Sequence, residues 1–305
     1  MNSNLPRVSI GMPIYNGERY LRSALDSLLA QTFEAFEIII SDNASTDATP
    51  AICSAYAAKD PRIRYYRNER NIGGAPNHNR TIELAAAKYF KWAHYDDIWA
   101  PDLLAQSVGI LDSYPSVVLC YSQTRIIDEH GNFGSDLAHG LSLRVASPVD
   151  RYRAFHRRYR REQQSGHVFL GLMRMDALKQ TRQHDSIYSA DIVLLAELAL
   201  LGEFYEIPEP LFHRRVHSES SCIKFTPQAV AVFEDPTNSG RLLLPRWRLA
   251  FELARSLQSS HLNFYEKLRC SPQIGLWYVR FSKGLVLELL LAVKQIMHLT
   301  PVQSR

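Results

Sequence analysis

The sequence predicts an α/β fold in which a mostly parallel sheet is flanked by helices. Two observations support this class. Short strand-like segments at residues 8–12, 36–40, 63–66 and 89–93 have the length of buried strands. Segments with helical spacing lie between them, at residues 18–31, 46–58 and 75–87. Strands that alternate with helices in this rhythm form βαβ units, whose strands run parallel.

The rest of the chain predicts further helices and strands, followed by a region with helical spacing alone. Residues 101–114 favour a helix, residues 117–121 a strand, and residues 168–175 have strand-like character. Residues 191–201 favour an amphipathic helix ended by Gly202, and residues 204–207 lead into Pro208 and Pro210. After about residue 225 only helical spacing remains, chiefly at residues 249–257 and 276–297. We therefore expect an α/β domain over residues 1–225 and a helical C-terminal extension over residues 226–305.

Composition restricts the class of protein and its location. The chain has 305 residues and a net charge of +4, and it is 46% hydrophobic and 22% charged. This is an ordinary globular balance, too weakly basic to indicate a nucleic-acid partner. The four cysteines are scattered without metal spacing, which favours a reducing compartment over a disulfide scaffold. The N-terminus has no signal-peptide pattern, and Glu288 and Lys294 interrupt the most apolar stretch, residues 284–297. These features predict a cytoplasmic protein whose membrane contact, if any, is peripheral.

Carboxylates follow directly after predicted strands. Asp42 ends one strand, and the pair Asp96-Asp97 follows another. Ligands of open parallel sheets bind where the carboxyl ends of strands converge, so these loops are expected to face one ligand. Asp96 and Asp97 offer the oxygen atoms that Mg²⁺ or Mn²⁺ prefers, and such a cation would neutralise a diphosphate. The alternative is a solvated loop in which Asp97 or Asp102 caps the next helix.

Two of the strand-end loops have residues suited to a nucleobase. Tyr15 offers an aromatic face for stacking, although it could equally be a half-buried loop aromatic. Asp42 could accept a hydrogen bond from a ring N–H of the base. The nearby Asp47 is assigned to a structural role at the start of the following helix.

Four motifs in the first 105 residues resemble the family 2 glycosyltransferases with the GT-A fold. They are residues 8–17, 40–47, 71–77 and 96–97, in the order and spacing of the family. The resemblance implies a Rossmann-like sheet and an inverting enzyme that uses a nucleotide-sugar donor. It implies that the loop around Tyr15 holds the base with Asp42, and that the loop around Asn71 closes over the nucleotide. The nucleotide-binding residues implied in this way are Pro13, Tyr15, Asn16, Asp42, Asn71 and Gly73.

The metal-binding pattern departs from the family at one position. The family often has Asp-x-Asp, in which Asp96 matches the second acid, and here His94 occupies the first position. We therefore rank Asp96 as the main ligand for Mn²⁺ or Mg²⁺ and Asp97 as the next. Whether His94 binds the metal stays open.

The resemblance continues beyond the nucleotide-binding half, residues 1–105, into an acceptor half, residues 106–225. Asp191 matches the general base of the family, although Ala190 replaces the acid that usually precedes it. The alternative for Asp191 is a helix N-cap. Arg215 and His217 match an Arg-x-His motif that lies near the diphosphate. Their alternative is an exposed basic turn, or a histidine satisfied in the core.

These features predict a metal-dependent transferase that moves a sugar from a nucleotide-diphosphate donor, by default UDP, to an acceptor hydroxyl. The expected acceptor is a glycan or a lipid-linked molecule, in the synthesis of a surface polysaccharide or another glycan. One alternative is a non-catalytic nucleotide-sugar-binding protein. Another is a sugar-phosphate nucleotidyltransferase, which usually begins with a glycine-rich phosphate loop that this sequence lacks.

Two features stay outside this interpretation. Six arginines crowd residues 151–161, either as a solvated helix face or as a dock for an anionic acceptor or a membrane surface. Residues 275–297 are rich in leucine and either pack on the domain or lie in a membrane interface.

Overall fold

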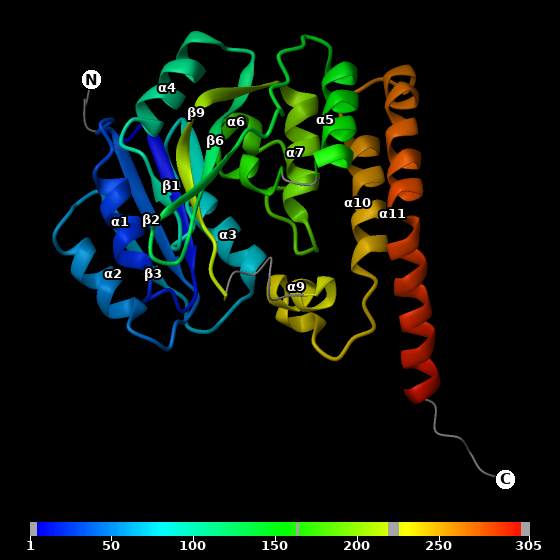
Figure 1. The fold of residues 1–305 in the computed structure, drawn as a ribbon, viewed down its shortest axis with the longest axis horizontal. Coiled ribbons are helices and arrows are strands. Elements are labelled where there is room, and N and C mark those ends of the chain that lie inside the picture. Colours follow the sequence, from blue (N-terminus) through cyan, green and yellow to red (C-terminus); the bar gives the residue numbers. More distant parts are fainter. Residues whose placement is uncertain (1–4, 163–164, 219–225, 300–305) are drawn as a thin grey trace.

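The computed structural model describes residues 5–162, 165–218 and 226–299. Its centre is a sheet of nine strands in the order β3-β2-β1-β4-β8-β6-β9-β5, with β7 paired to β6 (Figure 1). The strands are β1 (Val8–Ile14), β2 (Phe36–Asp42), β3 (Ile63–Arg67), β4 (Tyr89–Trp92), β5 (Ile98–Trp99), β6 (Val117–Ile127), β7 (Phe133–Leu137), β8 (Leu172–Arg174) and β9 (Glu203–Arg215). The α-helices are α1 (Leu21–Leu29), α2 (Thr49–Ala57), α3 (Gly74–Glu83), α4 (Leu103–Ser113), α5 (Pro148–Glu162), α6 (Met175–Leu178), α7 (Ala190–Leu201), α9 (Pro227–Glu234), α10 (Pro245–Ser259) and α11 (Phe264–Leu299), with short 3₁₀ turns at Ser165–Leu170 and Pro236–Asn238.

The first half of the sheet confirms the predicted βαβ rhythm. β1 pairs in parallel with β2 and with β4, and β2 pairs in parallel with β3. Every residue of β1 and β2 is buried, because helices cover both faces, so these strands are mostly apolar and do not alternate between apolar and polar residues. In the register Ile14 lies beside Asp42, which brings the loops after β1 and β2 side by side.

The second half of the sheet is mixed. β8 pairs antiparallel with β4 and with β6, while β9 runs parallel to β6. β9 continues through Pro208 and Pro210, where the sequence suggested that the strand ends. Between Ser122 and Thr124 of β6, the partner on β9 moves from Ile207 to Phe212. The two prolines lie in this bulge, where the ladder does not need their missing N–H groups.

The helix α7 corrects one prediction from periodicity. The sequence suggested an amphipathic helix with a solvated face, but eight of its residues are buried. α5 and α10 pack against it, and it also contacts β6. A helix enclosed on several sides needs apolar residues all round, and the sequence of α7 fits that rule.

The basic stretch at residues 151–161 falls on α5, and Arg151 and Arg160 hydrogen-bond to other helices. Arg151 is buried and donates hydrogen bonds to the carbonyl oxygens of Ala199 and Leu200, at the end of α7. Arg160 donates to the carbonyl and side-chain oxygens of Gln273 on α11. A cation on the terminal carbonyls of a helix complements its dipole, so Arg151 fixes α7 rather than facing solvent.

The helical C-terminal region follows the sheet, as predicted. α5, α7, α10 and α11 lie beside one another on one side of the sheet, with α11 outermost (Figure 1). Trp277 and Leu285 of α11 are buried. Across the described ranges, no helix combines the length and apolar character needed to cross a bilayer.

Candidate active site

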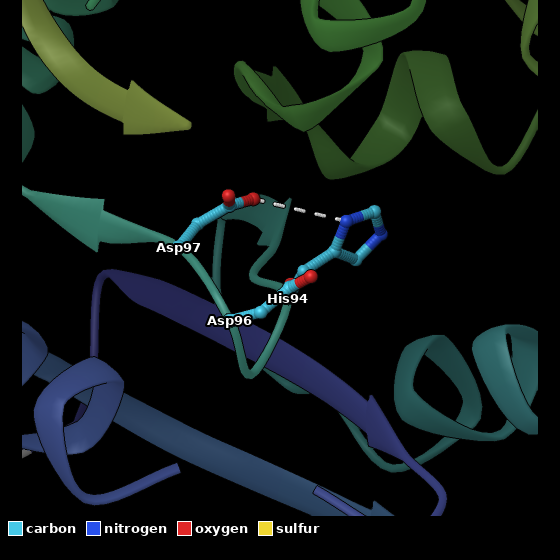
Figure 2. Close-up of side chains that lie close together, drawn as sticks. All are labelled: His94, Asp96 and Asp97. Carbon is cyan, nitrogen blue, oxygen red and sulfur yellow. Dashed lines mark ion pairs between the residues drawn. The ribbon is translucent and has the colours of Figure 1, made fainter. Parts of the chain in front are cut away.

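The predicted metal ligands lie together on the loop between β4 and β5. Ligand atoms of His94, Asp96 and Asp97 all lie within 4.8 Å of one another. Figure 2 shows the His94 ring directed toward the Asp97 carboxylate, with Nδ1 to Oδ2 at 3.9 Å. Asp97 is buried, so it is not the solvated loop carboxylate of the alternative interpretation. The structure groups the histidine that departs from the family pattern with the two acids.

Burial controls the charge of this cluster. Burial, with a smaller contribution from the charge of Asp96, raises the pKa of Asp97 well above its usual range. Burial also lowers the pKa of His94, although the charge of Asp96 opposes this change. Both effects favour neutral side chains, and a divalent cation reverses the preference for Asp97. Two carboxylates and a neutral imidazole form a donor set that fits a divalent metal ion.

The predicted Arg-x-His motif contacts this cluster from the end of β9. His217 Nε2 lies 3.1 Å from Asp96 Oδ2. The Arg215 backbone N–H donates to Asp97 Oδ1 at 3.0 Å, and its Nε donates to the carbonyl oxygen of Asp96 at 2.9 Å. Arg215 and His217 are both buried, so they do not form an exposed basic turn. Residues about 120 positions apart in sequence thus form one connected group.

The loops after β1 and β2 form a second group. Asn16 Oδ1 accepts a hydrogen bond from the Thr46 N–H at 2.8 Å, and the Asn16 N–H donates to Ser45 Oγ at 3.0 Å. Asn16 has a φ of 52°, a left-handed conformation that asparagine tolerates. Tyr15 beside it is 37% exposed. The loop therefore has a fixed backbone and an accessible ring.

Buried amides hold the loop that contains Asn71 and Gly73. Asn43 Nδ2 donates to Asn71 Oδ1 at 2.9 Å and to the carbonyl oxygen of Gly73 at 3.1 Å. Asn43 Oδ1 accepts from Asn68 Nδ2 at 3.0 Å and from the Ile72 N–H at 2.9 Å. Asn43 thus uses both ends of its amide to tie the Asn71 loop to the end of β2. Sequence reasoning missed this role, although Asn43 lies inside the second motif.

Asp42 is not the surface residue that the strand-end position suggested. It is 0% exposed, its Oδ1 accepts from the Ser45 N–H at 2.8 Å, and its Oδ2 accepts from the Tyr65 hydroxyl at 2.7 Å. Arg67 Nε lies 3.5 Å from Oδ2. The carboxylate therefore has a structural task, whatever it contributes to a base. Asp47 is structural as predicted, because it accepts from the Thr49 N–H at 2.9 Å.

Asp191 belongs to a third group, at the start of α7. The helix begins at Ala190 with Ser189 as its N-cap residue, so Asp191 lies inside the first turn and is not the cap. Burial raises the pKa of Asp191 to about 6, although the backbone N–H groups of Ile192 and Asp191 itself oppose this. A helix N-terminus favours an ionised carboxylate, and at Asp191 burial is the larger effect. Burial, and then the charge of Asp191, raises the pKa of both Tyr159 and Glu234.

Glu234 connects the third group to the second, and the sequence gave no signal for it. It lies at the end of α9, in the predicted helical extension. A Cβ atom on Gly73 would lie 2.6 Å from the Glu234 carbonyl oxygen. The structure thus brings Gly73, Glu234 and Asp191 into one neighbourhood.

Fold and site together define an α/β protein of the GT-A type, with a carboxylate cluster at the carboxyl ends of its strands. The chain matches the model of glycosyl transferase family 2 over residues 9–181, more than half of its length. It belongs to that family. The match ends before Asp191, Arg215, His217 and Glu234.

Relatives in sequence match only part of the chain. An uncharacterized protein of Mycobacterium tuberculosis is 40% identical over 139 residues, which are 45% of this chain and 40% of that protein. An uncharacterized glycosyltransferase of Rickettsia typhi is 32% identical over 152 residues, 50% of this chain and 44% of that protein. The matches thus span less than half the length of these curated relatives.

Solved structures share the fold over most of the chain. Staphylococcus aureus TarS in complex with UDP-GlcNAc has a TM-score of 0.65 and 15% identity, over 90% of this chain and 72% of that one. The mannosyltransferase PcManGT from Pyrobaculum calidifontis, in complex with GDP-Man and Mn²⁺, has a TM-score of 0.53 and 17% identity, over 96% and 87% of the two chains. At these identities the likeness is one of fold.

Proposed function

We propose that the protein is an inverting glycosyltransferase that moves a sugar from a nucleotide-diphosphate donor to an acceptor hydroxyl. The observation that carries this proposal is the direct contact of the Arg215 and His217 motif with Asp96 and Asp97. Two distant motifs of the family resemblance meet there around one acidic cluster. We propose UDP as the nucleotide, which TarS binds in one of the similar structures.

The roles of the residues follow from the three groups. Tyr15 stacks on the base, while Asp42 accepts from a ring N–H and Asn71 and Gly73 close over the nucleotide. Pro13 and Asn16 set the shape of the Tyr15 loop. The diphosphate faces the cluster of Asp96 and Asp97, where a bound Mn²⁺ or Mg²⁺ supplies charge stabilisation of the departing diphosphate.

Asp191 is the proposed general base. It takes the proton of the acceptor hydroxyl while the hydroxyl oxygen attacks the anomeric carbon on the face opposite the leaving diphosphate. One displacement inverts the configuration, by the same geometric logic as in inverting glycosidases. Burial of Asp191 places its pKa at about 6, near the pH at which such a base is effective.

His94 makes Mn²⁺ the preferred ion of the two. Mg²⁺ favours oxygen ligands in a strict octahedron, whereas an imidazole nitrogen suits transition metals better. The ligand atoms of His94, Asp96 and Asp97 lie close enough to share one ion.

The test of the proposal is a thermal-shift panel of UDP-, GDP- and dTDP-sugars, each with Mn²⁺, with Mg²⁺ and with chelator. A bound donor stabilises the native state by mass action, so one nucleotide should raise the melting temperature in a metal-dependent way. Hydrolysis or transfer of the same donor then separates an enzyme from a non-catalytic binder. The proposal fails if no nucleotide sugar shifts the melting temperature with either metal.

The expected acceptor is a lipid-linked molecule or a glycan, and the outer face of α11 supports contact with an anionic membrane. Leu268, Val279, Val286, Leu290 and Val293 are each more than half exposed. At 100° per residue these five positions lie within about 60° of one another, so they form one stripe along the helix. Arg269, Arg280, Lys283 and Lys294 occupy the side of the helix next to the stripe.

The described acids of α11 lie away from this stripe. Glu266 accepts a hydrogen bond from the Asn263 N–H at the start of the helix. Glu288 is buried and pairs with Arg246 of α10. An apolar stripe bordered by cations suits a surface of anionic lipid. Such contact would hold the enzyme next to a lipid-linked acceptor.

A further inference from the structure

Glu234 carries a buried oxygen that has no partner within the described residues. The residue is 8% exposed, and its Oε2 accepts no hydrogen bond there. A carboxyl oxygen removed from water without a partner destabilises the folded state. Groups of this kind persist when they have a task, and none of the roles proposed above uses Glu234.

The position of Glu234 is fixed by two glycines at the start of α3. Its carbonyl oxygen packs on Gly73, and a Cβ atom on Gly74 would lie 2.8 Å from its Oε2. Gly73 has a φ of 96°, which a side chain rarely adopts. α9 therefore packs directly against the Asn71 loop, and Figure 1 also shows α9 beside α3.

The charge of the proposed base also affects the pKa of Glu234. Burial, and then the charge of Asp191, raises the pKa of Glu234 to about 8. Asp191 has a pKa of about 6. Near neutral pH the two carboxyls therefore hold different protonation states, with Asp191 ionised and Glu234 protonated. A protonated carboxyl can both donate and accept a hydrogen bond, which matches the capacity of a hydroxyl group.

We propose that Glu234 binds a hydroxyl group of the sugar being transferred. The inference rests on the proposed function, in which Gly73 lies at the nucleotide and Asp191 at the acceptor hydroxyl. The transferred sugar lies between these two ends of the reaction. Glu234 packs on the first and is electrostatically coupled to the second. The proposal therefore assigns its unpartnered oxygen to that sugar. The residue is a specificity determinant supplied by α9, beyond the segment that matches the family model.

The experiment compares binding of the whole nucleotide sugar with binding of its nucleoside diphosphate, so that the contribution of the sugar can be measured. The nucleotide sugar that most stabilises the wild-type protein in the panel is titrated by calorimetry, alongside its nucleoside diphosphate, with Mn²⁺ present. Glu234→Ala should weaken binding of the nucleotide sugar about tenfold, the effect of one neutral hydrogen bond. Binding of the nucleoside diphosphate should stay unchanged. Glu234→Gln keeps a donor and an acceptor, and should bind the nucleotide sugar within about threefold of wild type.

Asp235→Asn is the matched control. Asp235 accepts a hydrogen bond from the Thr237 N–H, and asparagine can keep that bond, so neither affinity should change. Equal losses for diphosphate and nucleotide sugar in the Glu234 variants would show a structural role and overturn the inference. Unchanged affinity with slower transfer would place the hydroxyl on the acceptor and overturn it as well. If no nucleotide sugar binds the wild type, the proposed function itself fails, which is a different result.

Discussion

His217 Nε2 lies 3.1 Å from Asp96 Oδ2, and this contact joins the end of β9 to the loop after β4. The two residues are 121 positions apart, and His217 is almost fully buried beside the Tyr20 ring. An imidazole that holds a carboxylate in this way limits its rotation, as outer-shell partners do at metal sites. His217, from the second half of the chain, thus fixes the orientation of the Asp96 carboxylate.

Asp96→Ala should abolish measurable transfer and remove the metal dependence of nucleotide binding. The variant loses the carboxylate that we propose as the main metal ligand, which is also the partner of His217. Loss of one group that stabilises developing charge costs about 10²–10³-fold in rate. Transfer assays and calorimetry with and without Mn²⁺ measure both effects.

Asp102→Ala is the control for this change. Asp102 is an exposed acid of the following loop whose side chain accepts a hydrogen bond from the Thr32 hydroxyl, so activity should stay near wild type. Retention of Mn²⁺-dependent activity in Asp96→Ala would refute the assignment of the metal site.

Tyr15→Ala should weaken nucleotide binding without unfolding the protein. The ring is 37% exposed, so its loss leaves no core cavity. Stacking of a base on an aromatic ring contributes about 1–3 kcal/mol, which is about 5- to 150-fold in affinity. Calorimetry with UDP measures the loss, and a melting curve checks the fold. Affinity equal to wild type would remove Tyr15 from the base site.

Asp42 needs a more conservative substitution than Tyr15, because its carboxylate accepts structural hydrogen bonds. Asp42→Ala would remove the hydrogen-bond acceptor of both the Ser45 N–H and the Tyr65 hydroxyl, so it should lower the melting temperature. Asp42→Asn keeps one acceptor and should stay folded while nucleotide affinity falls. If Asp42→Asn binds UDP as wild type does, the carboxylate has only its structural task.

Local periodicity predicts much of this fold, and tertiary context decides the rest. The buried runs of β1, β2 and β4 and the helices between them follow from the sequence, because each pattern lies within one element. β5 has only two residues and exists because β9 is there to pair with it. β9 passes through two prolines because a bulge in its pairing with β6 accommodates them. No sequence pattern near α9 predicts that Glu234 lies against Gly73.

The apolar stripe of α11 should bind anionic vesicles. Deletion from residue 275 is a poor test, because it would remove the buried Trp277 and Leu285 and open the core. Val279→Glu with Leu290→Glu adds two negative charges at positions that are 72% and 63% exposed, so the fold should survive. Co-sedimentation with phosphatidylglycerol vesicles should fall several-fold, since acids on an apolar membrane face repel anionic lipid.

Phe133→Glu is the control for the vesicle experiment. Phe133 lies on β7 and is 67% exposed, so the substitution adds a negative charge away from α11. Its co-sedimentation should match the wild type. Equal sedimentation of the wild type and the α11 variant would show that this stripe does not face a membrane.

Asp191→Asn should give a folded protein that binds donor and is nearly inactive. Asparagine keeps the shape of the side chain in the first turn of α7, while the group that accepts the proton is lost. Loss of a general base lowers the rate by about 10²–10⁴-fold. Donor affinity should stay close to wild type, because the base acts on the acceptor. Single-turnover assays and calorimetry separate the two effects.

The pH profile gives an independent test of Asp191. A base works in its deprotonated form, so activity is present above its pKa and is lost as the pH falls. With a pKa raised to about 6, kcat/KM of the wild type should fall about tenfold per unit below pH 6. This acidic limb should be missing from the residual activity of Asp191→Asn. Glu197→Gln, on the same helix, weakens the contacts of Glu197 with Arg182 and should keep the limb.

Near-wild-type turnover in Asp191→Asn would show that another residue is the base. Glu203 pairs with Arg144, and Glu206 accepts from the backbone N–H groups of residues 139 and 140, so the search would turn first to His217.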